Sequence, residues 1–87
     1  MRMNIKKEQL MNQLIDLIKV RYPEIEILNI EPSAEDPDDI WIHVNADMDE
    51  EREFEMCHYA AELETDILVD YGYSFSFITH NPNVEYA

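Results

Sequence analysis

The residues that could carry out chemistry lie closest together in the stretch EFEMCHYAAE, residues 53–62. It places the only cysteine, Cys57, next to a histidine, His58. A thiolate with a neighbouring imidazole can act as a nucleophile, and cysteine, histidine and carboxylate side chains are the usual protein ligands of zinc. Both kinds of chemistry need the side chains to point toward one place. The conformation of this stretch therefore decides whether it is a site.

The stretch falls within a segment that we expect to be helical from about residue 49 to residue 71. Asp47 or Asp49 can serve as the N-cap, and three glutamates in the first turn suit the positive end of a helix dipole. Gly72, the only glycine, follows where a left-handed residue commonly ends a helix.

Cys57 and His58 diverge on this helix, since successive residues are about 100° apart. Cys57 faces the edge of the expected core, where cysteine behaves as a small hydrophobe, and His58 lies on the opposite, acidic face. We therefore assign no catalytic residue to the stretch. The apolar face is expected to consist of Met56, Ala60, Leu63, Ile67 and Tyr71, extended on one side by Phe54, Cys57, Ala61 and Leu68. The acidic face has Glu51, Glu55, His58 and Glu62, and we treat these four as a candidate binding surface.

His58 and Glu62 are also a weak candidate pair for a metal ion, because residues four apart share a helix face. Surface carboxylates at this spacing are usually only solvated, so we expect no cofactor. Glu64 needs more explanation, because it falls within the apolar face and a buried carboxylate requires a partner. Lys7 or Arg21 of the first helix could provide one. The alternative is a long side chain that reaches water at the helix edge.

The remaining elements follow from periodicity and from prolines. A helix is expected over 5–22, capped by Asn4 and ended by Pro23, with Leu10, Met11, Leu14, Leu17, Ile18 and Tyr22 on one stripe. Strands are expected over 24–31, with a register shift between Ile27 and Leu28, over 40–46 and over 73–80. The sequence thus predicts one α+β domain spanning residues 1–87. It is a small two-layer sandwich of order α-β-β-α-β, with both helices on one face of a three-stranded sheet and a tail over 80–87 that need not be ordered.

Two further surfaces are candidate interfaces. In the strand 40–46, Trp41, His43 and Asn45 share the outward face, and tryptophan is enriched among interface hot spots. The alternative is that the loop over 32–39 or the tail covers Trp41. In the strand 73–80, three aromatic residues are expected to be core. Because that strand lacks charged residues that would hinder pairing, it could join two copies of the chain into a homodimer.

The charge is distributed unevenly along the chain. The 87 residues carry 20 acidic and 6 basic side chains, for a net charge of −14. From Pro23 onward, eighteen acidic residues accompany a single basic one, Arg52. Such a surface repels phosphate backbones, so we expect no direct nucleic-acid binding and favour a basic protein partner. The alternative is that the carboxylates only maintain solubility.

Cellular location and function follow as expectations. A single cysteine excludes a disulfide framework, the N-terminal region is charged throughout, and no run approaches the roughly 20 apolar residues of a membrane span. We therefore expect a cytoplasmic protein without membrane contact. The favoured function is a non-catalytic interaction or regulatory module, for example an immunity or antitoxin protein that mimics nucleic-acid charge. The alternatives are a metal-dependent or catalytic domain using His58 and Glu62, or His43, assembled across a dimer, and a structural accessory subunit.

Overall fold

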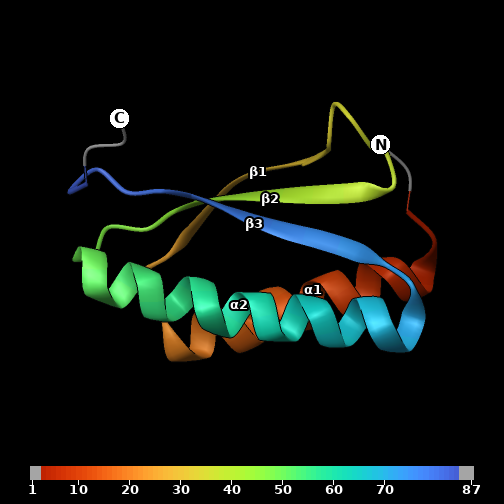
Figure 1. The fold of residues 1–87 in the computed structure, drawn as a ribbon, viewed down its shortest axis with the longest axis horizontal. Helices are drawn as coiled ribbons and strands as arrows, with labels where there is room; N and C mark the ends of the chain where they lie inside the picture. Colours follow the sequence, from red (N-terminus) through yellow and green to blue (C-terminus); the bar gives the residue numbers. More distant parts are fainter. Residues whose placement is uncertain (1–2, 85–87) are drawn as a thin grey trace.

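The computed structural model describes residues 3–84 and confirms the predicted α+β class and element order (Figure 1). Every predicted element is present, with its ends within two residues of the expected positions. The elements are α1 (Ile5–Arg21), β1 (Glu26–Pro32), β2 (Asp39–Asn45), α2 (Glu50–Tyr71) and β3 (Ser74–His80).

The three strands form one mixed sheet in the order β1-β2-β3. Strands β1 and β2 are antiparallel, and their register shifts between Ile27 and Asn29, where the sequence predicted a bulge. Strand β3 runs parallel to β2, because α2 carries the chain back along the sheet before β3 begins. As a result β1 and β3 are the two edges of the sheet.

Both helices cover the same face of the sheet (Figure 1). In β2, Ile40, Ile42 and Val44 are buried against them, while the alternate residues face away from the helices. The other face of the sheet has no helix over it. The buried apolar core consists of Leu10, Met11, Leu14, Ile15, Ile18, Tyr22, Ile25, Ile40, Ile42, Val44, Ala46, Met48, Met56, Ala60 and Phe75.

The predicted apolar faces of the helices were too wide. Leu17 of α1 is 50% exposed, and Phe54 and Leu68 of α2 are 66% and 48% exposed. In α2, Met56 and Ala60 are the fully buried residues, because the sheet and α1 contact only a narrow stripe of this helix. Several large apolar side chains therefore remain on the outer surface of the helical layer.

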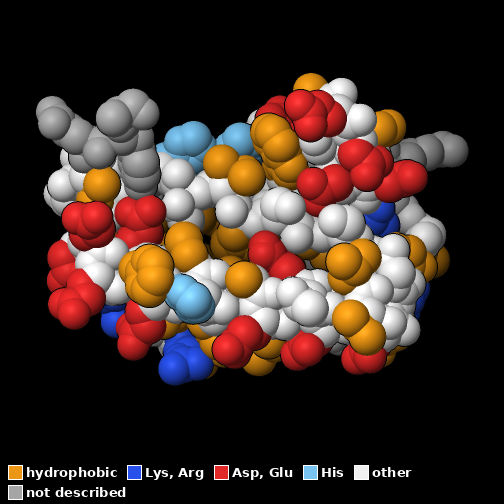
Figure 2. Space-filling model, in the orientation of Figure 1, with side chains coloured by type: hydrophobic (Ala, Val, Ile, Leu, Met, Phe, Trp, Pro, Cys, Tyr) orange, Lys and Arg blue, Asp and Glu red, His pale blue; other side chains and the backbone are white. Residues whose placement is uncertain are grey.

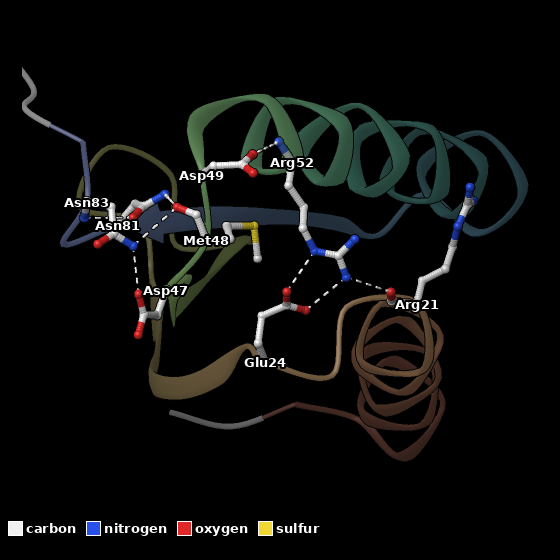
Figure 3. Close-up of polar contacts among 8 residues, drawn as sticks. All are labelled: Arg21, Glu24, Asp47, Met48, Asp49, Arg52, Asn81 and Asn83. Carbon is white, nitrogen blue, oxygen red and sulfur yellow. Dashed lines mark hydrogen bonds and ion pairs between the residues drawn. The ribbon is translucent and has the colours of Figure 1, made fainter.

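Arg52 connects the start of α2 to the end of α1 (Figure 3). Its Nε donates to Glu24 Oε2 at 2.7 Å, and a terminal nitrogen donates both to Glu24 Oε1 at 3.0 Å and to the Arg21 carbonyl at 3.2 Å. The guanidinium also lies over the ring of buried Tyr22, 4.7 Å from its centre. This bidentate ion pair lowers the pKa of the Glu24 carboxyl.

Side-chain hydrogen bonds hold the segment that follows β3, as far as Asn83. Asn81 is buried and donates to Glu53 at 2.8 Å. It also donates to the Met48 carbonyl at 2.7 Å, and Asn83 donates to Asp47 at 2.6 Å (Figure 3). Residues 85–87 of that predicted tail lie outside the described part. Within residues 3–84, no helix has both the length and the apolar composition needed to cross a bilayer.

Both helices begin and end as the sequence predicted. The side chains of Asn4 and Asp49 each accept a backbone N–H in the first turn of their helix, at 2.7 Å. Gly72 ends α2 with φ of +78°, the left-handed conformation, and donates its N–H to the Leu68 carbonyl. No atom lies within 4 Å of the position that a Cβ on Gly72 would occupy. Any penalty for a side chain there is therefore a backbone penalty.

We predict that Gly72→Ala lowers the free energy of unfolding by about 1 kcal/mol, the usual cost of a left-handed conformation for an L-residue. Gly72→Asn should lose less, because asparagine tolerates this conformation. Urea unfolding followed by circular dichroism measures both. Equal stability of the alanine variant and the wild type would contradict the observed end of α2.

Candidate functional site

The uncovered face of the sheet carries a hydrogen-bonded row of side chains that crosses all three strands. His43 of β2 contacts Glu31 of β1 through Nε2, at 2.9 Å from Oε1, and His80 of β3 through Nδ1, at 3.0 Å from Nε2. Asn29 donates to the other oxygen of Glu31 at 3.2 Å. These contacts are diagonal, since His43 is directly opposite Asn29 and Ile78 in the register. We call Glu31, His43 and His80 the relay.

The two imidazoles meet edge to edge. Their ring centres are 5.3 Å apart and their nearest nitrogens 3.0 Å apart, with 24° between the ring planes. This geometry is that of an in-line hydrogen bond between nearly coplanar rings. An ionised carboxylate only accepts, so neutral His43 carries its proton on Nε2 and His80 donates from its own Nε2. The second nitrogen of His80, Nδ1, belongs to an exposed side chain.

Trp41 lies on the same face, beside the relay, and is partly exposed. Its indole N–H donates to Asp39 at 3.2 Å, and its ring approaches His43 edge-on. Asp39 also accepts from Ser74 at 2.9 Å and from Ser76 at 3.2 Å. Trp41, His43 and Asn45 thus share one half-buried surface, as their alternation predicted.

The other four candidate residues lie on the outer face of α2, so the structure does not bring the two groups together. Glu51, Glu55, His58 and Glu62 are all exposed. The His58 ring contacts the exposed ring of Phe54, with 4.6 Å between centres. Figure 2 shows histidine atoms at the top of the molecule, above the sheet, and separately on the helical side.

Cys57 and His58 point to different surroundings. The Cys57 sulfur lies 4.0 Å from the Thr79 hydroxyl, between α2 and β3, and burial raises the pKa of this thiol. A raised pKa keeps sulfur protonated and unreactive. Residues 3–84 contain no cluster of three or more histidine, cysteine, aspartate or glutamate side chains placed to hold a metal ion. For His58 and Glu62, the structure therefore provides no third ligand of these types.

Glu64 has a partner that the sequence did not indicate. Its Oε1 accepts the backbone N–H of Phe77, in the middle of the edge strand β3, at 3.1 Å. The two expected cations are used elsewhere: Lys7 binds the Asp38 carbonyl, and Arg21 lies over Tyr59. Burial, opposed by the Phe77 hydrogen bond, raises the pKa of Glu64 to about 7. A homodimer through residues 73–80 stays a prediction, and it would require Glu64 to release this donor.

No protein-family model matches the chain, and neither a curated protein nor a solved structure gives a significant match. The site must therefore be interpreted from its own geometry.

Sequence reasoning missed the relay, although it had singled out His43. The signal was present: residues 74, 76, 78 and 80 alternate with the core positions of the last strand, so His80 shares their outward face. The missing information was that β3 lies beside β2, which places His80 next to His43.

We predict that Glu64→Gln removes a pH-dependent loss of stability. The folded pKa of about 7 exceeds the ordinary 4.5, so the folded state binds more protons and stability falls as pH rises between these values. Because Glu64 is only partly buried, we expect the variant to gain about 1 kcal/mol relative to wild type across that range. Glutamine keeps the acceptor for Phe77. Urea unfolding at several pH values measures the difference.

Glu62→Gln is the matched control, since Glu62 is exposed on the same helix and has the same charge. Glu62→Gln should change the free energy of unfolding by a similar amount at each pH. It should leave the pH dependence that Glu64 causes as it is in the wild type. If the two variants have parallel pH profiles, the Glu64 carboxyl does not titrate as described.

Proposed function

We propose that the protein is a non-catalytic interaction module that binds a basic protein partner through the outer face of α2. The observation that carries the proposal is an exposed phenylalanine among exposed carboxylates. Phe54 is 66% exposed and lies in a shallow surface depression with Asp49, Glu51, Arg52, Glu55 and His58. A partner with lysine or arginine beside an apolar surface would complement both features.

Within residues 3–84, the basic side chains offset the charge of these carboxylates only in part. Arg52 is the basic residue nearest to them in sequence, and Glu24 holds it through two hydrogen bonds. Lys6, Lys7 and Arg21 lie over the rings of Tyr71, Tyr73 and Tyr59. Figure 2 shows acidic atoms spread along the helical side and only small basic areas at its margins. The negative potential of α2 is therefore available to a partner.

Phe54 would give this surface an anchor that charge alone does not supply. Interface hot spots are apolar side chains surrounded by residues that exclude water, and charged rims contribute mainly to the association rate. A guanidinium of the partner could also stack on the Phe54 ring. A specific version of the proposal is an immunity or antitoxin protein that occupies the nucleic-acid site of a basic partner, with α2 in place of the phosphates.

We predict that the triple substitution Glu51→Gln, Glu55→Gln and Glu62→Gln weakens binding of a labelled peptide of lysine, arginine and one aromatic residue by about tenfold. Each exposed ion pair contributes about 0.5 kcal/mol, and three of them amount to about one power of ten in affinity. Wild-type binding should weaken steeply with salt, and the variant should show a shallower dependence. Fluorescence anisotropy at several salt concentrations measures both quantities.

The control is Asp16→Asn, Glu35→Gln and Asp38→Asn, which removes the same charge from exposed positions outside α2. It should retain most of the affinity. If both triple variants lose equal affinity, the protein attracts cations through its net charge alone, and α2 is not a specific surface.

Phe54→Ala separates the apolar contribution from the charge. We expect it to weaken the same peptide several-fold with an unchanged salt dependence, since no charge is removed. Stability should remain near wild type because the ring is mostly exposed. Unchanged affinity for the peptide would remove Phe54 from the proposed surface.

A further inference from the structure

We propose that the relay is a binding site for a divalent transition metal ion such as Zn²⁺ or Ni²⁺. His43 Nδ1 and His80 Nε2 would be the two protein ligands, and Glu31 would orient His43 from behind. The remaining coordination positions would be open to water on the uncovered face of the sheet. This site is distinct from the proposed partner surface on α2 and does not depend on it.

The distance between the two nitrogens is that of a hydrogen bond, and it also lies within the range for two ligands of one ion. They are 3.0 Å apart. Zinc–nitrogen bonds of about 2.0–2.1 Å place two ligand nitrogens about 2.9 Å apart at a right angle and about 3.3 Å apart in a tetrahedron. The observed distance lies between these values. Because the two nitrogens point at each other along the hydrogen bond, both rings must rotate so that an ion replacing it lies to one side of the line between them.

Glu31 provides the support that metal-binding histidines typically have. A ligating histidine usually donates its other N–H to a carboxylate, which fixes the tautomer and raises the basicity of the ligating nitrogen. The contact of Glu31 Oε1 with His43 Nε2, at 2.9 Å, has this arrangement. It leaves Nδ1 of neutral His43 with its lone pair directed toward His80. Asn29 in turn holds the second oxygen of Glu31.

The protons balance without a co-reactant. In the ion-free state the Nε2–H group of His80 donates a hydrogen bond to His43 Nδ1. When His80 binds the ion through Nε2, its proton is on its own Nδ1 instead. Both imidazoles remain neutral, and the ion adds two positive charges to a chain of net charge −14. Imidazole ligands favour zinc, nickel and copper over magnesium and calcium.

The proposed metal site has fewer protein ligands than a site whose whole coordination shell comes from side chains. Since no third histidine, cysteine, aspartate or glutamate side chain joins the pair within residues 3–84, protein supplies two ligands and solvent completes the shell. The side chain of His43 is 18% exposed and that of Glu31 46% exposed. The inner ligand is thus sheltered, and His80 lies at the open side.

Calorimetric titration of the full chain with ZnCl₂ or NiCl₂, in excess MgCl₂ to occupy the surface carboxylates, tests the proposal. We expect saturation at one ion per chain. His43→Ala and His80→Ala should each weaken binding at least tenfold, and Glu31→Gln about 10- to 100-fold, the usual effect of losing an orienting carboxylate. His58→Ala is the matched control, since His58 lies on α2, apart from the relay. This variant should bind the metal ion as tightly as the wild type does.

Proton NMR of the imidazole rings gives an answer that does not depend on variant folding. Zinc should shift the ring signals of His43 and His80 and leave those of His58 in place. Equal shifts of all three histidines, loss of binding in excess MgCl₂, or wild-type affinity in the His43 and His80 variants would each overturn the proposal. The salt-dependent peptide binding of α2 should be unaffected by His80→Ala, so failure of one proposal is distinguishable from failure of the other.

Discussion

The structure depends on one constraint: a short chain with a single core can cover only one face of its sheet. Ile40, Ile42 and Val44 are buried against the two helices as part of a single apolar core cluster. The opposite face must then be stable beside water. This face is stable because its polar side chains are hydrogen-bonded. Asp39 accepts from the Trp41 indole and from two serines, and Glu31, His43 and His80 are hydrogen-bonded to one another. Polar side chains at those positions are a requirement of the two-layer architecture.

The same constraint explains how the few cations are placed. Arg52 is the only basic residue after position 21, and it lies where the end of α1, the loop before β1 and the start of α2 meet. Lys6, Lys7 and Arg21 of α1 cover tyrosine rings at the margins of the helical layer. Positive charge is used to join elements of the fold, and the outer surface of α2 keeps its negative charge. The two proposed activities thus belong to opposite sides of the molecule.

Local signals in the sequence were sufficient to predict the elements. Asn4, Asp49 and Gly72 define helix ends through hydrogen bonds and backbone conformation within a few residues, and the alternation in 40–46 defines the faces of β2. Pairings between distant strands were not predictable in this way. The contact of His43 with His80 depends on β3 lying parallel to β2 in one register, which no local pattern specifies. Glu64 was recognised as unusual, but its partner is a backbone N–H, and a backbone group has no signature in the sequence.

The two edges of the sheet have a consequence for aggregation. Strand β1 is interrupted by its bulge, and on β3 the Glu64 side chain takes the Phe77 donor. Neither device relies on net charge, since the bulge is geometric and a carboxyl oxygen accepts a hydrogen bond whether or not the group is protonated. Near the isoelectric point of about 4.2 the mutual repulsion between molecules is small, yet both devices remain in place. A loss of repulsion between molecules at that pH does not by itself free the Phe77 donor to pair with a further strand.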